Sequence, residues 1–131
     1  MTDRKLISKA AEVMENSYSP YSRFKVGAAI ETTDGTVFVG CNIENAAVGS
    51  TMCAEAAAIA AAISAGKRSF KRIAIISDGS AYCFPCGTCR QLLNEFSPEI
   101  EVLSARSDGR YVSYSLSSLL PMAFGKDHMG T

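Results

Sequence analysis

The sequence predicts an α/β protein with three layers (α/β/α), in which helices cover both faces of a mixed, five-stranded sheet. One observation is the order of the expected elements. An opening helix is followed by a hairpin, a helix, a strand, a helix and two strands, which is typical of layered α/β folds. The other is size and composition, since 131 residues with 47% hydrophobic side chains can bury roughly two thirds of their unfolded surface. We therefore expect residues 1–131 to form a single domain.

The first expected elements are a helix and a β-hairpin. Apolar side chains recur at helical spacing between charged positions over residues 4–17, which indicates an amphipathic helix. Pro20 follows and excludes a continuation, because proline lacks a backbone donor and restricts the residue before it. Residues 24–30 and 36–41 are then typical of two paired strands, with Thr33-Asp34-Gly35-Thr36 as the turn between them.

The next elements are an alanine-rich helix and a buried strand. The run 53–65 has high intrinsic helix propensity, and Ser50 or Thr51 is expected to cap it. Glu55 would then lie in the first turn of a buried helix. Residues 73–76 form a short continuous apolar run, which is typical of a strand buried on both faces.

The last part of the chain predicts a helix and a second strand pair. A loop over residues 79–85 leads into a helix over 87–96, which Ser-Pro then ends. Residues 101–104 and 111–115 predict two strands across an Asp-Gly turn, and residues 116–120 a short helix. Both long helices after the hairpin follow strands, and crevices at strand ends are where sites form in open α/β sheets.

Charge and hydropathy argue against several partner classes. The formal net charge is zero and 20% of the residues are charged, so nothing favours a nucleic-acid polymer. The most apolar stretch, residues 54–65, contains Glu55 and is too short to span a bilayer, so we expect no membrane partner. The N-terminus shows no basic leader followed by an apolar run. We expect a cytoplasmic protein.

The cysteines point to metal binding through sulfur. The chain has five cysteines, and Cys83, Cys86 and Cys89 follow one another at three-residue spacing. In a reducing compartment this spacing favours metal or redox chemistry over a disulfide framework. His128 is the only histidine and lies in the last four residues, where chains usually fray. Any metal site is therefore expected to consist of thiol ligands.

Two short motifs together describe an open zinc site beside a base. Cys53-Ala54-Glu55 supplies one thiol and a carboxylate, and Pro85-Cys86-Gly87-Thr88-Cys89 supplies two more thiols. Catalytic zinc takes three protein ligands and leaves the fourth position to water, whose pKa it lowers toward neutrality. Glu55 is the carboxylate within the motif that can carry protons. Because both motifs open helices, the unpaired N–H groups there are expected to favour thiolates by lowering their pKa.

These residues resemble those of a known family, the small homotetrameric cytidine deaminases of the three-cysteine type. The zinc deaminase signature is H-x-E followed by P-C-x-x-C, with a variant that uses three cysteines. The resemblance covers nearly the whole chain. Beyond the two motifs it extends through Phe24-Lys25-Val26-Gly27-Ala28-Ala29, Cys41-Asn42-Ile43-Glu44-Asn45-Ala46 and Leu119-Leu120-Pro121-Met122-Ala123-Phe124.

The resemblance implies a reaction and a cofactor. Cys53, Cys86 and Cys89 would hold one Zn²⁺ per chain, and Glu55 would move protons between water, the pyrimidine ring and the departing amine. The activated water would attack C4 of the base. Cytidine and 2'-deoxycytidine would become uridine and 2'-deoxyuridine with release of ammonia, a step of pyrimidine salvage.

The resemblance also implies substrate contacts and an assembly. Phe24 would contact the pyrimidine, the Ala54 backbone would bind the base edge, and Asn42 and Glu44 would hydrogen-bond the ribose hydroxyl. That polar recognition would reject analogues lacking the group. The loop after Asn45 and the aromatic of the C-terminal segment would complete a neighbouring subunit's site, so a homotetramer with shared sites is expected. The further substrate-binding positions are Ala46 and Phe124.

Two departures from the family pattern leave alternatives open. The family usually carries arginine directly after Cys-Ala-Glu, where this chain has Ala56, and tyrosine where this chain has Val48. Blasticidin S deaminases share the zinc motifs and lack that arginine, so another cytosine nucleoside is an alternative substrate. From a different class, a non-catalytic zinc-binding or redox module could use Cys86-Gly87-Thr88-Cys89 alone.

Four further residues near the motifs have simpler expected roles. Cys41 is expected to be a small buried hydrophobic residue and Cys83 a loop thiol. Arg90 and Gln91 follow the second motif directly, and their side chains can serve to satisfy backbone carbonyls or a subunit contact.

Overall fold

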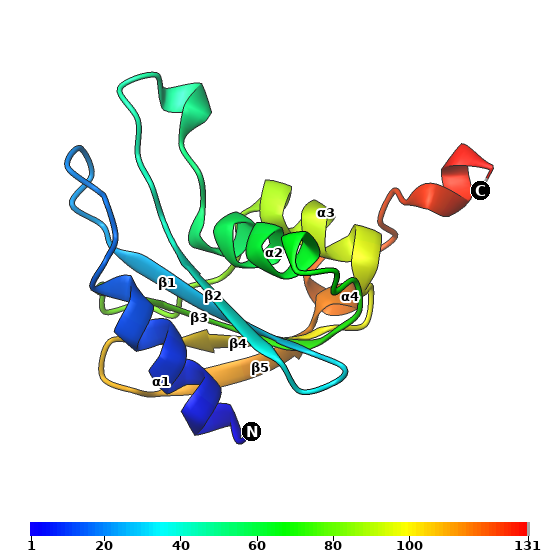
Figure 1. Ribbon diagram of the computed structural model, residues 1–131, viewed down its shortest axis with the longest axis horizontal. Coiled ribbons are helices and arrows are strands. Elements are labelled where there is room, and N and C mark those ends of the chain that lie inside the picture. Colours follow the sequence, from blue (N-terminus) through cyan, green and yellow to red (C-terminus); the bar gives the residue numbers. More distant parts are fainter. Residues whose placement is uncertain (131) are drawn as a thin grey trace.

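The computed structural model describes residues 1–130 and shows one mixed sheet between helical layers (Figure 1). The strand order is β2-β1-β3-β4-β5; β3 and β4 run parallel, and the other neighbours are antiparallel. The predicted fold class, a three-layer α/β/α arrangement with five strands, is confirmed. The strands are β1 (Val26–Thr32), β2 (Val37–Cys41), β3 (Phe70–Ser77), β4 (Glu101–Ala105) and β5 (Tyr111–Ser115).

The helices divide between the two faces of the sheet. Helix α1 covers one face, and α2 and α3 cover the other, with α4 at the end of β5 (Figure 1). None of these helices is long and apolar enough to cross a lipid bilayer, among the residues that the structure describes. The bounds are α1 (Asp3–Met14), α2 (Ala54–Ser64), α3 (Gly87–Phe96) and α4 (Leu116–Leu119), with short 3₁₀ helices η1 (Val48–Ser50) and η2 (Lys126–Met129).

Strand β3 lies at the centre of the sheet, and its side chains are apolar on both faces because each face packs into a core. Ile73 and Ile75 pack into the core beneath α2 and α3, whereas Ala74 and Ile76 pack into the core beneath α1. Side chains of a strand alternate between the two faces, so a strand covered on both faces reads as a continuous apolar run. The prediction of a doubly buried strand is confirmed.

Helix α2 lies directly on the backbone of β2. A Cβ atom placed on Gly40 would come within 2.7 Å of the Ala54 carbonyl oxygen and of the Ala57 Cβ, closer than real contacts allow. Only glycine lets a helix and a strand approach this closely. The alanines of α2 and the glycine of β2 therefore fix the distance between the helix that begins after Cys53 and the sheet.

Strand β1 lies two residues later than predicted, at Val26–Thr32 rather than 24–30. Two elements differ from their predicted bounds by three residues at one end. Helix α1 ends at Met14 rather than at residue 17, and Ser17 instead donates from its hydroxyl to the side chain of Asn42. Strand β3 begins at Phe70, three residues before the predicted 73–76 run. The extension includes Lys71, which is exposed, and Arg72, whose charge is neutralised by neighbouring carboxylates.

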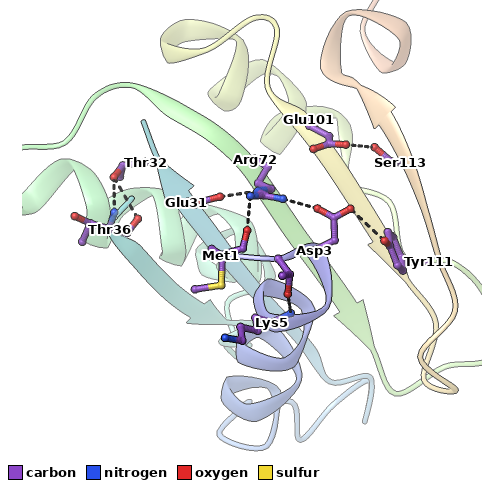
Figure 2. Close-up of polar contacts among 11 residues, drawn as sticks. Met1, Asp3, Lys5, Glu31, Thr32, Thr36, Arg72, Glu101, Tyr111 and Ser113 are labelled. Atoms are coloured by element: carbon purple, nitrogen blue, oxygen red, sulfur yellow. Dashed lines mark hydrogen bonds and ion pairs between the residues drawn. The ribbon is translucent and has the colours of Figure 1, made fainter. Parts of the chain in front are cut away.

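Arg72 on β3 is the centre of that neutralisation (Figure 2). Its Nε lies 2.6 Å from a Glu31 carboxylate oxygen, and its Nη2 donates to the Met1 carbonyl oxygen at 2.7 Å. A third donor, Nη1, binds Asp3, whose other oxygen accepts a hydrogen bond from the Tyr111 hydroxyl at 3.1 Å. The guanidinium thus joins the start of α1 to three strands of the sheet.

Candidate functional site

Three sulfur atoms gather where α2 and α3 begin. Cys53 is the residue before α2, Cys86 is the residue before α3, and Cys89 lies in the first turn of α3. The three Sγ atoms lie within 4.8 Å of one another, and those of Cys53 and Cys86 are 3.7 Å apart. Two Zn–S bonds of about 2.3 Å at a tetrahedral angle separate their sulfurs by about 3.8 Å. The cluster therefore fits a zinc ion with three protein ligands and a fourth position free.

The start of α2 is not capped by either of the predicted residues. Neither Ser50 nor Thr51 caps α2, because Cys53 holds the capping position and makes no side-chain bond to the helix. Thr51 instead accepts a hydrogen bond from the Asn45 N–H at 3.2 Å, within the loop before the helix. The first-turn N–H groups of α2 are thus left without a hydroxyl partner, and the Cys53 thiol lies at this electropositive end.

The expected lowering of the thiol pKa values holds for one cysteine and is wrong for two. Burial raises the pKa of Cys53 to about 11, helped by a hydrogen bond with Cys86 and by the charge of Glu55. Burial likewise raises the pKa of Cys89 well above the usual thiol value. At Cys86 burial acts in the same direction, but hydrogen bonds from the Cys89 N–H and thiol outweigh it and the pKa is lowered. Coordination to a metal therefore has to displace protons that the helix starts alone do not remove.

Glu55 points from the first turn of α2 toward this cluster and is buried, with 4% of its surface exposed. Burial raises the pKa of its carboxyl group, against opposing hydrogen bonds from the backbone N–H groups of Glu55 and Cys86 and from the Cys89 thiol. A carboxylate merely favoured by the helix dipole would be exposed. Glu55 is instead a carboxyl group whose proton affinity is shifted toward the range needed for proton transfer.

One pocket of about 240 Å³ opens beside the sulfur cluster. It brings together most of the predicted site residues, since Phe24, Asn42, Ala54 and Glu55 line it with Cys53 and Cys86. Five residues without a predicted role in the site complete the lining: Val26, Thr51, Met52, Cys83 and Phe84.

Asn42 is held in place by contacts with the chain. Its amide donates to the Phe24 carbonyl oxygen at 2.8 Å, and its carbonyl oxygen accepts from the Val26 N–H at 3.0 Å and from the Ser17 hydroxyl. A side-chain amide has two N–H donors, and only one is used by these contacts. The side chain is therefore fixed in orientation and retains one donor for a ligand.

Glu44 and Ala46 lie in a neighbouring pocket of about 450 Å³, which shares Thr51 with the first. The Glu44 carboxylate accepts hydrogen bonds from the N–H groups of Tyr21 and Ser22, at 2.9 and 3.1 Å, and from the Ser22 hydroxyl. The Ser22 hydroxyl contributes most to lowering the pKa of Glu44. An ionised carboxylate has about four acceptor positions, so Glu44 can still accept from a ligand hydroxyl.

Phe124 lies apart from both pockets of its own chain. Its carbonyl oxygen accepts from the Gln91 amide at 2.7 Å, and its exposed ring stacks on that of His128 at 5.1 Å between centroids. Arg90 donates to the carbonyl oxygens of Pro85 and Leu119 at 2.7 and 2.8 Å. The simpler expectation for Arg90 and Gln91, that they satisfy backbone carbonyls, is confirmed.

Most of the pocket residues without a predicted role directly precede one of the two cysteine motifs. Thr51 and Met52 precede Cys53 directly, and Cys83 and Phe84 precede the Pro-Cys motif directly. Cys83 is a partly buried loop thiol, as expected, and burial raises its pKa to about 11. Adjacency to the motifs could have indicated these positions, whereas a loop aromatic such as Phe84 has no periodicity from which its direction follows.

Comparison with known proteins agrees with this geometry. The sequence profile described as "Cytidine and deoxycytidylate deaminase zinc-binding region" matches residues 1–104. Cytidine deaminase of Sporosarcina psychrophila is 42% identical over 130 residues, which cover 98% of this chain and 96% of that protein. Cytidine deaminase of Halalkalibacterium halodurans is also 42% identical over 130 residues, covering 98% of each chain.

A solved structure shows the same fold. The crystal structure of cytidine deaminase from Burkholderia pseudomallei superimposes on this chain with a TM-score of 0.91 at 44% sequence identity. The superposition covers 95% of this chain and 100% of that one. Agreement therefore extends from the zinc-binding profile to the whole layered fold. Together with the three-sulfur cluster beside Glu55, these comparisons show that the chain belongs to the cytidine and deoxycytidylate deaminase family.

Proposed function

We propose that this protein catalyses the hydrolytic deamination of cytidine and 2'-deoxycytidine to uridine and 2'-deoxyuridine, with release of ammonia. The observation that carries the proposal is the cluster of three thiols and the buried Glu55 beside one pocket large enough for a pyrimidine, which Cys53, Cys86 and Glu55 line. Relatives that align over nearly the full chain are named cytidine deaminase, which supports the same activity here.

Cys53, Cys86 and Cys89 would hold one Zn²⁺ per chain. Bound zinc would supply a water of lowered pKa for the hydrolysis. Glu55 would take the two protons of this water in turn, and would deliver the first to the ring nitrogen of the pyrimidine and the second to the departing amine. Its raised pKa supports this exchange, because a proton carrier works best with a pKa near the working pH.

The pocket residues orient the nucleoside. Phe24 contacts the pyrimidine, the Ala54 backbone binds the base edge, and the free N–H of Asn42 donates to the ribose hydroxyl, from which Glu44 accepts. Ala46 lies beside Glu44 in the neighbouring pocket. The hydrogen bonds that already fix Asn42 and Glu44 support this assignment, since a rigid polar pair selects strongly for a sugar that completes it.

Charge supports a nucleoside rather than a nucleotide as the substrate. Among the described residues, the linings of the two pockets contain Glu44 and Glu55 and no lysine, arginine or histidine. A 5'-phosphate needs cationic or clustered N–H partners, and two carboxylates would repel it. Cytidine should therefore be a better substrate than its 5'-monophosphate.

The enzyme is proposed to work in the cytoplasm as a homotetramer with shared sites. Val48 and Phe124 are strongly exposed apolar side chains. They lie on the loop between β2 and α2 and on the C-terminal tail, which extend away from the layers (Figure 1). Exposed apolar side chains of this kind support burial against another copy. The thiol ligands must stay reduced, which supports a reducing compartment.

The test replaces Glu55 and measures zinc and turnover together. Glu55→Ala and the isosteric Glu55→Gln should each bind one zinc per chain by metal analysis, because the thiols are untouched. Turnover of cytidine, followed by ultraviolet absorbance, should fall at least about 100-fold in both, since a positioned proton carrier contributes that much or more.

Two results would contradict the proposal in different ways. Retained turnover in the Glu55 variants would refute the proton-transfer role. A wild-type protein that binds zinc but leaves cytidine and 2'-deoxycytidine unchanged would refute the activity and favour a binding module or another substrate, such as blasticidin S.

A further inference from the structure

The segment 78–85, here called the rim loop, joins β3 to α3 and borders the pocket. Its first residue pairs with the end of the segment before β1: the Asp78 N–H donates to the Lys25 carbonyl oxygen at 3.1 Å, and the Lys25 N–H donates to the Asp78 carboxylate at 3.2 Å. A Cβ placed on Gly79 would lie 3.2 Å from Cε1 of Phe24. The start of the rim loop therefore lies directly against the Phe24 ring.

Two aromatic side chains anchor the other end of the rim loop, one to Arg106 just after β4 and one to β5. The Arg106 guanidinium lies 5.5 Å from the centre of the Tyr82 ring. The Phe84 ring lies 6.0 Å from that of Tyr114 on β5, tilted by 53°. Tilted aromatic pairs at this separation attract one another and hold each ring in orientation. Phe84 is thus fixed at the end of a loop that is tied down at three places.

Phe84 nonetheless remains open to the pocket. The residue is 39% exposed although its ring packs on Tyr114, and it lines the same pocket as Phe24 and Glu55. It lies two residues before Cys86, on the side of the sulfur cluster. Any molecule whose amine is to exchange protons with Glu55 must bring its base to this end of the pocket.

We propose that the Phe84 ring contacts the pyrimidine base, opposite or beside Phe24, and thereby sets the affinity for the nucleoside. The inference rests on the proposed deaminase function and adds a binding residue that the sequence motifs do not include. A phenyl ring offers the base a flat apolar surface without competing for its hydrogen-bonding edge, which the Ala54 backbone takes. The rim loop and the segment before β1 then supply one aromatic ring each to a single base.

The test compares kinetic constants for cytidine among matched variants. Phe84→Ala should raise KM at least about fivefold with kcat within about twofold, because base-aromatic contacts contribute that much to binding or more. Phe84→Tyr keeps the ring and should restore KM to near the wild-type value. The dissociation constant of uridine, measured by calorimetry on the zinc-loaded protein, should rise in parallel with KM in Phe84→Ala.

Tyr114→Leu is the matched control. It removes the ring on which Phe84 packs, yet Tyr114 does not line the pocket. If Phe84 serves only to pack on the sheet, Tyr114→Leu should raise KM as much as Phe84→Ala. A direct contact predicts a clearly smaller rise, because the Phe84 ring is still present to meet the base. Zinc content and melting temperature are measured for each variant, and Phe84→Leu, which keeps apolar volume without the ring, replaces Phe84→Ala if the latter does not fold.

The outcomes separate this inference from the function on which it rests. An active wild type with unchanged KM and uridine affinity in Phe84→Ala overturns the base contact and leaves the deaminase proposal standing. Equal effects of Phe84→Ala and Tyr114→Leu also overturn it. An inactive wild type overturns the function itself.

Discussion

The zinc site would carry a net negative charge, which is unfavourable for the activation of a water molecule. Three thiolates on Zn²⁺ leave one net negative charge, and Glu55 adds another when ionised. Arg90 is the cation next to Cys89 in the chain, but its guanidinium donates to the carbonyls of Pro85 and Leu119. A metal surrounded by negative charge withdraws electrons from bound water less strongly. The half-buried Ala56 stands where the family usually places a compensating arginine.

A positive charge introduced at position 56 should raise the catalytic efficiency of the enzyme. Ala56→Arg is expected to raise kcat/KM for cytidine about fivefold, the effect of roughly 1 kcal/mol of added electrostatic stabilisation. It should also shift the acidic limb of the pH–rate profile to lower pH, because a nearby cation favours the ionised form of an acid. Ala56→Met, which adds comparable length without charge, is the control. An unchanged rate and pH profile, or the same gain in Ala56→Met, would show that charge is not limiting.

The gathering of the sulfurs and Glu55 could be predicted because two motifs at helix starts leave few ways to arrange them. The pKa values of the thiols could not, since they depend on burial that only the assembled fold determines. The predicted cap of α2 is wrong for a related reason. Thr51 has the right residue type, but its hydroxyl binds the Asn45 N–H within the preceding loop. Local preference was overridden by the path of that loop.

Among the elements, β3 shows how a charged residue can occupy the centre of a sheet. The Arg72 side chain is 12% exposed and its partner Glu31 on β1 is 5% exposed, so both charges are largely removed from water. Such a pair is tolerated only when each remaining donor and acceptor is satisfied. Met1, Asp3 and Tyr111 complete the network, which ties the start of α1 to the sheet (Figure 2).

Removing one charge from this network should destabilise the protein. Glu31→Gln is expected to lower the free energy of unfolding by about 2 kcal/mol, since it leaves a buried guanidinium partly unpaired. Glu15→Gln is the matched control because Glu15 is 70% exposed and lies 4.0 Å from Lys25. Its effect should stay below about 1 kcal/mol. Urea unfolding of both variants measures their free energies of unfolding. Equal losses in the two variants would contradict the idea that burial makes the Glu31–Arg72 pair important for stability.

The same network explains which element boundaries could be predicted. The apolar run 73–76 identified the centre of β3, but a strand that also contains Lys71 and Arg72 has no hydrophobic signal at its start. Its extension depends on Glu31 and Asp3, which are remote in sequence. Strand β5, by contrast, has the predicted bounds Tyr111–Ser115 because an Asp-Gly turn and the following serine-rich helix delimit it locally.

At the scale of the whole molecule, the pocket residues and the proposed completing residue lie on different parts of the surface. Phe124 is exposed on the tail and lines neither the pocket of Glu55 nor that of Glu44. Its position in the tail is fixed by Gln91, on the outer side of α3. If Phe124 contributes to a site, that site belongs to another copy of the chain, which no single sequence can reveal through its own contacts.

Mixing two weakly active variants tests this sharing of sites. Phe124→Ala and Glu55→Ala are each expected to be weakly active alone. After unfolding and refolding together in equal amounts, about one quarter of the sites should combine an intact Glu55 with a partner's intact Phe124, if the subunits associate at random. Activity should then rise to about one quarter of the wild-type level. Activity no greater than the mean of the two separate variants would contradict shared sites.

The contact between Gly40 and α2 also bears on how such an enzyme can diversify. A helix resting on backbone atoms has no side chain that could adjust to a new neighbour, so a substitution at Gly40 would displace α2, and with it Glu55, from the sheet. Natural variation is therefore expected to leave this contact unchanged. New substrate ranges among descendants should instead arise in the loop 42–52 and in the rim loop, where side chains reach the two pockets and no helix rests on the backbone of a strand.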